Sequence, residues 1–450
     1  MKNQLLFTVS LAPLLVLSCS SPSSQNYQVE LSSHFKNGVD IGGQIQAPSW
    51  SSFNDAKVTS LVEQVRRSNT DLKAASAQAR EFLALVRLAK SSSALQIDGG
   101  LSAQSDFQDG GSTREFAGGL SGAFEVDLWG RFRKETQAAA SRAWASSAAK
   151  GSLQLSLEAQ AVSAYYTLQS FDSQIQSTKQ AISRLNTQAG YVDKQIEAGL
   201  LGSFEESRID FAISTLEANL VSLKTDRNRV ENALAVLVGT TPSAYHVQEK
   251  ALSKAPPTIG TYLPSSLLER RPDILEAQAL LEANEADIGV AWADFFPRLN
   301  LIGLLGVNSP SLSSLFQSSE AASAGASLLG PVVDGGRRRA NFEAAGARRD
   351  KALADVESTV LRAFEDAENS LSDAELLNAE YLARKRAVEN MRKTAERVRE
   401  RQRQGIDSLF QLVSVELRLN EEENLMAAVR GQQFVAAANV VRSLGGDWKR

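Results

Sequence analysis

Residue types that commonly perform catalysis or hold metals are scarce in this sequence of 450 residues. It contains two histidines, His34 and His246, and one cysteine, Cys19. Structural zinc sites take about four Cys or His ligands, more than the chain has, and a disulfide needs two cysteines, so we expect neither within one chain. We therefore expect no catalytic residues, no metal site, no cofactor and no enzymatic activity.

Charged residues point to no other chemistry. Acidic clusters such as Glu421–Glu423 fall in helical patterns, where solvated helix faces explain them better than paired acid and base catalysts. No phosphate-binding loop, nucleophile elbow or kinase motif is present in the sequence. The net charge is −4 with both signs interspersed, so there is no basic patch and we expect no nucleic acid partner.

The amino terminus has the pattern of an export signal. Lys2 and the apolar run Leu5–Leu17 predict a signal peptide over residues 1–18, because a membrane-spanning helix needs about 20 apolar residues. Val16-Leu17-Ser18-Cys19 resembles a bacterial lipobox, in which cleavage before the cysteine is coupled to acylation of its thiol. Under this resemblance Ser20 fits sorting to the outer membrane. An ordinary secretory signal with an incidental Cys19 is the alternative.

Two long proline-free stretches, Arg131–Ala198 and Arg337–Gln404, organise the rest of the chain. Apolar residues recur in them every three or four positions, which predicts helices that need a partner along their whole length. Each helix would reach about 100 Å. Gly199 and Gly405 follow the two stretches and can reverse the chain in the left-handed conformation, so each half contains a long helical hairpin.

Two segments change to a period of two. Residues 95–128 alternate apolar with polar side chains on either side of an Asp-Gly-Gly-Ser turn, and residues 297–333 follow the same pattern less clearly, with a return strand around 324–333. A helix is expected from Phe53 toward the first hairpin. The sequence therefore predicts four strands in two hairpins.

The sequence contains a tandem repeat. Asp71-Leu72 matches Asp273-Ile274, 202 residues later, and Gly199 matches Gly405, 206 residues later. We divide the chain into a lipid-anchored arm (19–52), a first repeat (53–239, with its helical hairpin at 131–239), a proline-rich linker (240–272), a second repeat (273–445, with its helical hairpin at 337–445) and a tail (446–450).

The four strands suit a shared membrane barrel. Strands survive in lipid only in a closed barrel, and the smallest such barrels have about eight strands, so several chains must pool theirs. Two chains give eight strands and three give twelve, and only the larger barrel encloses water. Polar faces carrying Asp98, Asp106 and Asp127 would line the lumen. The charged helices must extend into water.

Several motifs together resemble the TolC-like outer membrane efflux proteins, in particular the lipoprotein factors of resistance-nodulation-division drug pumps. They are Leu263–Ile274, Ile288–Ala291 with Phe295–Pro297, Asp334–Arg337 and Leu444–Trp448. The resemblance implies a fold that is mainly α with a β-barrel part: a homotrimer with a twelve-stranded barrel and a periplasmic tunnel of duplicated helical hairpins. It implies a passive exit duct for drugs or other small molecules, docked through a periplasmic adaptor to a proton-driven inner-membrane pump.

The resemblance also places functional residues at the hairpin tips. Gly199, Leu200, Leu201, Gly405, Ile406 and Asp407 match the tips that contact the adaptor. The predicted periplasmic gate consists of Glu205, Gln402, Asp407, Gln411 and Ser414. Family members narrow the mouth with aspartates where this chain has Gln411 and Ser414. Glu205 and Asp407, near Arg401 and Arg403, are expected to form polar ties between helices instead.

Two readings compete with the efflux duct. The same architecture could serve a type I protein secretion system. A lipid-anchored coiled-coil tether across the periplasm would explain the long helices and Cys19, but it would not explain the duplicated strands. The sequence names neither the cargo nor the cognate adaptor and pump.

Overall fold

The computed structural model describes residue 36 and residues 49–108, 111–252, 254–259, 267–317, 320–446 and 448. The predicted signal peptide, Cys19 and all of the predicted arm before residue 49 except residue 36 lie outside this part. The elements are η1 (Trp50–Phe53), α1 (Ala56–Ser68), α2 (Thr70–Ser91), β1 (Gln96–Gln108), β2 (Gly111–Val126), α3 (Arg131–Glu197), α4 (Ser203–Leu237), η2 (Pro242–Ala244), α5 (Leu267–Arg270), α6 (Pro272–Ala293), β3 (Arg298–Ser309), η4 (Leu312–Gln317), β4 (Glu320–Leu329), α7 (Arg337–Arg403) and α8 (Leu409–Ser443).

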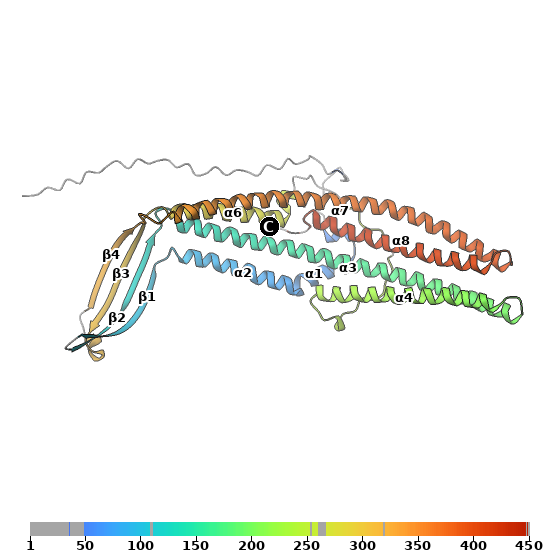
Figure 1. Ribbon diagram of the computed structural model, residues 1–450, viewed down its shortest axis with the longest axis horizontal. Helices are drawn as coiled ribbons and strands as arrows, with labels where there is room; N and C mark the ends of the chain where they lie inside the picture. Colours follow the sequence, from blue (N-terminus) through green and yellow to red (C-terminus); the bar gives the residue numbers. More distant parts are fainter. Residues whose placement is uncertain are drawn as a thin grey trace, which may run out of the picture.

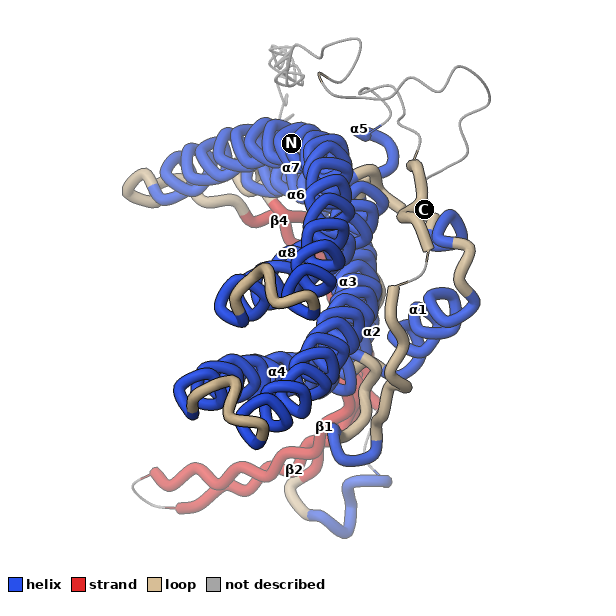
Figure 2. The backbone as a smooth tube through the Cα atoms, turned by 90° about the vertical axis from the view of Figure 1, so that its right-hand side faces the viewer, coloured by secondary structure: helices blue, strands red, loops and turns tan. Residues whose placement is uncertain are grey.

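The molecule is elongated, with the strands at one end and both hairpin tips at the other (Figure 1). The two long helices α3 and α7 each have 67 residues, which corresponds to about 100 Å. Helix α3 packs along α2, α4, α6 and α8, and α7 packs along α6 and α8. Seen from the tip end, the α7/α8 hairpin lies beside the α3/α4 hairpin (Figure 2).

Matching positions of the two predicted repeats make similar contacts. The Asn69 amide donates to the Leu237 carbonyl (2.9 Å), and the Arg271 guanidinium donates to the Ser443 carbonyl (2.9 Å). These contacts hold the start of α2 against the end of α4, and the start of α6 against the end of α8. Each repeat is therefore closed by the same kind of contact.

One buried polar pair has diverged between the repeats. Arg227 and Asp172 form an ion pair of 2.6 Å between α4 and α3 in the first repeat. At the matching positions of the second repeat, Gln433 and Asn378 form an amide hydrogen bond of 3.3 Å. A neutral pair in place of an ion pair keeps the contact between the helices and avoids the cost of burying charge.

Three local expectations were wrong. The helix expected from Phe53 begins at Ala56 and is interrupted at Asn69. The interruption arises because the Asn69 side chain caps α2 by accepting hydrogen bonds from the Asp71 and Leu72 amides. The return strand expected around 324–333 is β4, which ends at Leu329, and the Gly330-Pro331 pair that follows cannot continue a ladder.

Asp127 is the third correction. It lies beyond the end of β2, and its carboxylate accepts hydrogen bonds from the Phe132 and Arg133 amides (3.2 and 3.1 Å). It therefore caps the start of α3 and does not line a strand face.

The four strands form one antiparallel sheet in the order β1-β2-β3-β4, and their register sorts the side chains into two faces. Residues paired across the strands point to the same face. Ile97, Gly122, Gly303 and Ala324 are paired in this way across the four strands, and Leu120 pairs with Leu305 on the same face. Most of this face is apolar, but Ser105, Arg114 and Ser309 also lie on it, toward the strand ends that are farther from the helices. The opposite face carries Asp98, Asp106 and Ser121, although Ile302 and Leu304 also lie there.

Candidate gate at the helix tips

The two hairpin tips have the same backbone geometry. Gly199 and Gly405 both have φ of +73°, which side chains rarely adopt. The amides after each helix bond back to its last turn, Leu200 to the Gln195 carbonyl and Ile406 to the Arg401 carbonyl, in a Schellman motif. Leu200 and Ile406 are consequently presented to solvent at the far end of the molecule, while Leu201 is partly buried beneath them.

Asp407 is held within its own tip. Arg401 donates to both Asp407 carboxylate oxygens (2.9 and 3.0 Å), and the Asp407 side chain is only 8% exposed. This carboxylate also raises the pKa of Arg401. The pair closes the turn between α7 and α8, and among the described residues the Asp407 side chain bonds to Arg401 and not to the α3/α4 hairpin.

Glu205 also pairs with a residue of its own helix. Its carboxylate lies 4.0 Å from Arg208, one turn further along α4, and Arg403 lies 4.0 Å from Glu400 in α7. Gln411 and Ser414 are exposed on α8, where the Ser414 hydroxyl donates to the Phe410 carbonyl of the same helix. None of these side chains reaches the other hairpin within the residues described.

Gln402 is the predicted gate residue that does join the hairpins. The Gln188 amide on α3 donates to the Gln402 side-chain oxygen on α7 at 2.7 Å. This hydrogen bond lies among apolar side chains, because Leu185, Val192, Leu412 and Val398 belong to the core between the two hairpins.

Arg208 is a further residue at the tips, which the sequence did not single out. Its guanidinium lies 4.8 Å from the centre of the Phe204 ring on α4 and 4.7 Å from the centre of the Phe410 ring on α8, so it lies between the two rings. A guanidinium over an aromatic face is attractive. Phe204 and Phe410 are 206 residues apart and occupy matching positions of the two repeats, which was the available signal.

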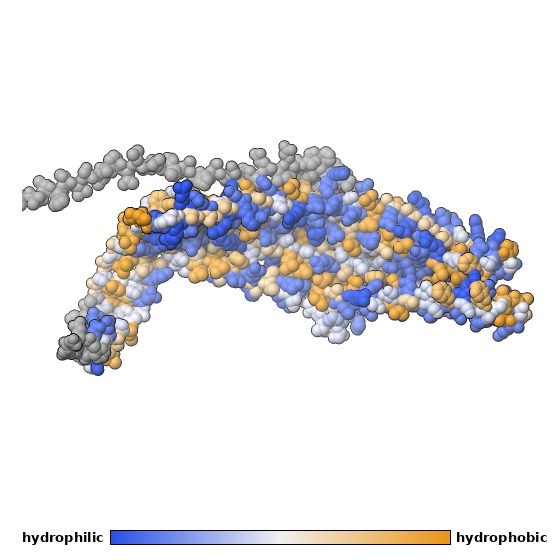
Figure 3. Space-filling model, in the orientation of Figure 1, coloured by the Kyte–Doolittle hydropathy of each residue, from blue (hydrophilic) through white to orange (hydrophobic). Residues whose placement is uncertain are grey.

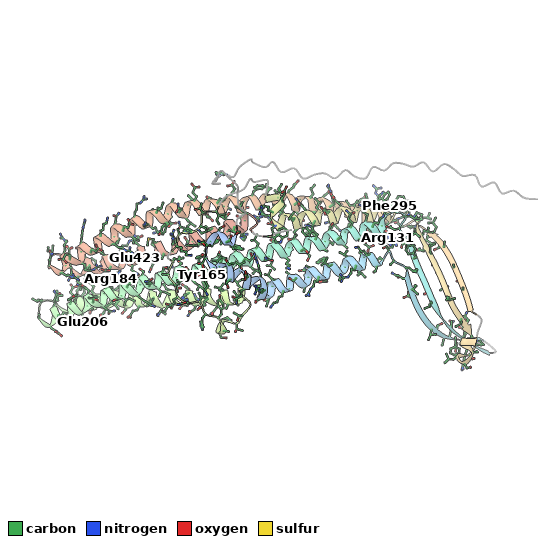
Figure 4. All side chains as sticks on the ribbon, turned by 180° about the vertical axis from the view of Figure 1, so that it is seen from behind. Arg131, Tyr165, Arg184, Glu206, Phe295 and Glu423 are labelled. Carbon is green, nitrogen blue, oxygen red and sulfur yellow. The ribbon has the colours of Figure 1, made fainter. Side chains whose placement is uncertain are left out.

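Two buried acids of α8 were missed as well. Glu416 is 2% exposed and accepts from Arg184 on α3 (2.8 Å) and from Arg399 on α7 (3.1 Å). Two turns further on, Glu423 accepts from the Ser177 hydroxyl on α3 (2.8 Å) and from Arg392 on α7 (2.7 Å) (Figure 4). Each carboxylate therefore ties three helices together above the tips.

These contacts correct the expectation for the acidic cluster Glu421–Glu423. Glu421 is exposed as expected, but Glu422 and Glu423 are buried. Their positions share the face of α8 that packs on α3 and α7, where arginines supply the opposite charge. The periodicity of the acids alone did not distinguish this face from the solvated one.

Among the described residues no helix is long and apolar enough to cross a membrane. The long helical hairpins joined to a two-faced sheet define the class of protein, an outer membrane channel protein. The solved outer-membrane channel OprN is 28% identical, covers 95% of this chain and 98% of its own, and superposes with a TM-score of 0.83. This confirms the fold class predicted from the sequence.

The chain belongs to the outer membrane efflux protein family, whose model matches residues 61–240 and 263–446. The cation efflux system protein CusC of Escherichia coli is 26% identical over 98% of this chain and 98% of its own. The probable outer membrane lipoprotein SilC of Salmonella typhimurium is 25% identical over 88% of this chain and 87% of its own. The family predicted from the sequence motifs is thus confirmed, and with it the outer membrane location.

Proposed function

We propose that three copies of the chain form the exit duct of a tripartite efflux pump, anchored by an acylated Cys19. The observation that carries this proposal is the sheet. One of its faces is largely apolar and the other is largely polar, as in a barrel with lipid outside and water inside.

Within the described part of the chain the sheet is open at both sides, since β1 and β4 each pair with one neighbouring strand. The helices continue the same two edges, with α2 leading into β1 and α7 following β4. Unpaired edges do not persist in lipid, so β1 of one copy would pair with β4 of the next. Three copies give about twelve strands, enough to enclose water, and the helices extend the wall as a tube.

Planar bilayer recordings test the duct. Purified protein is expected to insert and conduct in discrete steps, because the polar strand faces would surround a water-filled lumen. A coiled-coil tether would show no conductance, so protein that folds and associates with vesicles but never conducts would contradict the proposal.

The tips are proposed to contact a periplasmic adaptor that links the duct to a proton-driven inner-membrane pump. Leu200 and Ile406 support this, because both are large, apolar and exposed at the end of the molecule farthest from the strands (Figure 1). Photocrosslinkers placed at these two positions are expected to capture an adaptor. Capture of an ATP-driven exporter complex would instead support protein secretion.

The mouth of the tube is proposed to rest closed and to open when the α7/α8 hairpin moves away from the α3/α4 hairpin. Glu205, Gln402, Asp407, Gln411 and Ser414 form the predicted gate, and Arg208 adds the aromatic contact described above. Replacing Glu205 by Gln together with Asp407 by Asn is expected to increase leakage of large antibiotics into cells. Unchanged permeability would remove both carboxylates from the gate.

A further inference from the structure

The chain turns two corners where the sheet meets the helices. The first corner comprises residues 127–134, between β2 and α3, and the second comprises residues 330–339, between β4 and α7. Arg131 and Phe295 mark this region in Figure 4. Both corners combine exposed apolar side chains with outward-facing cations.

The second corner exposes two valines and two arginines. Val332 and Val333 are 93% and 89% exposed, which is costly in water for two adjacent apolar side chains. The Arg339 side chain is 82% exposed and pairs only with Glu343 at 2.9 Å. Arg337 is exposed, and within the described part of the chain it has no ion pair or side-chain hydrogen bond.

The acids of this corner face inward. Asp334 accepts from Arg338 at 2.6 Å, and both side chains are largely buried. Arg338 is therefore structural, whereas Arg337 and Arg339 are free to contact another molecule. Helix α7 has no acidic residue in its first turn, so these arginines lie unfavourably at the positive end of the helix dipole.

The first corner repeats the arrangement. Leu128 and Trp129 are exposed, and the Arg133 side chain is 79% exposed. Asp127 is turned inward to cap α3, which also lacks an acidic residue in its first turn. The first corner occupies the matching position of the other repeat and resembles the second, although Arg133 also pairs with Asp127 at 3.5 Å.

Aromatic side chains join the first corner to the turn between α6 and β3. The Trp129 indole donates to the Pro297 carbonyl (2.7 Å) and stacks on Phe296 (4.6 Å), which also contacts Trp292 (4.6 Å). Tryptophan is enriched where a membrane meets water. Apolar and polar surface alternate around this bend between the sheet and the helices in Figure 3.

We infer that the two corners bind the headgroups of anionic phospholipids in the periplasmic leaflet. The strands end at the corners, so in a membrane barrel the corners lie at headgroup depth. The guanidinium groups of Arg337 and Arg339 match the geometry of a phosphate, and Val332 and Val333 fit among the first acyl carbons. This inference rests on the proposed barrel and adds the lipid that it selects.

The test compares lipid selectivity in reconstituted protein. Full-length protein is placed in phosphatidylcholine vesicles containing spin-labelled phosphatidylglycerol or spin-labelled phosphatidylcholine, and the immobilised fraction of each label is measured. Wild-type protein is expected to prefer phosphatidylglycerol. R337Q/R339Q is expected to weaken this preference about thirtyfold, because each of the two basic residues contributes about 1 kcal/mol near a charged surface.

The matched control is R386Q/R397Q, which removes the same charge from exposed positions far along α7 and should retain the preference. An unchanged preference in R337Q/R339Q would overturn the inference. So would loss of the preference in inorganic phosphate at constant ionic strength, which would show a site for free phosphate, or loss of the oligomer, which would show a contact between copies.

Conductance of the same vesicles separates two kinds of failure. Wild-type protein that conducts without preferring phosphatidylglycerol contradicts the lipid inference alone. Protein that neither inserts nor conducts contradicts the proposed duct and the lipid inference together.

Discussion

Glu416 offers the sharpest test of how the tube mouth is held. Its buried carboxylate is the shared acceptor for Arg184 on α3 and Arg399 on α7. Glu416→Gln keeps the shape and removes the charge, leaving two guanidinium groups without a counter-ion. Breaking a buried ion pair costs about 3–5 kcal/mol, which we reduce to about 2 kcal/mol because both arginines are partly exposed and can turn to water.

In a symmetric oligomer the free-energy changes of the individual copies add. If the contact is made only in the closed state, three copies lose about 6 kcal/mol, which shifts the ratio of closed to open by about 10⁴-fold. Single-channel recording in planar bilayers measures the open probability directly, and Glu416→Gln is expected to raise it strongly.

The matched control is Glu421→Gln on the same helix, where the carboxylate is exposed and pairs only with Arg418 at 2.8 Å. It should leave the open probability unchanged, since exposed pairs contribute about 0–1 kcal/mol. Equal open probabilities for wild type, Glu416→Gln and Glu421→Gln would refute the reasoning. A lower unfolding temperature with unchanged gating would assign Glu416 to stability alone.

Three further predictions concern the tips and the anchor. Arg208→Gln removes the cation between the two phenylalanines and is expected to increase antibiotic leakage, whereas Arg229→Gln, an exposed change on the same helix, should not. Gly405→Leu places a side chain at φ +73° and is expected to block adaptor capture while the oligomer persists; loss of the oligomer would reassign the defect to folding. Cys19→Ser should remove the acyl mass seen by mass spectrometry, and an unchanged mass would disprove acylation.

The long helices and their reversals could be predicted from sequence because each rests on a local signal. A proline-free apolar stripe ending in a glycine specifies α3 and Gly199 without reference to the rest of the fold, and the same holds for α7 and Gly405. Because the sequence repeats, the same signal for each element occurs a second time.

The contacts between hairpins could not be predicted in the same way. Glu416 and Glu421 are both acids in one helical pattern, and only the packing of α8 on α3 and α7 buries the first and leaves the second in solvent. Asp407 was expected to tie helices together near Arg401 and Arg403, and Arg401, six residues earlier, reaches it across the turn. Sequence spacing shows which residues share a helix face, but not which face a neighbouring helix covers.

Several chains must pool their strands to close a barrel, so the mass of the complex is the most direct test. Native mass spectrometry of the protein extracted from membranes is expected to show three copies in one complex. A folded complex that contains a single copy would contradict the account, because four strands cannot close a barrel.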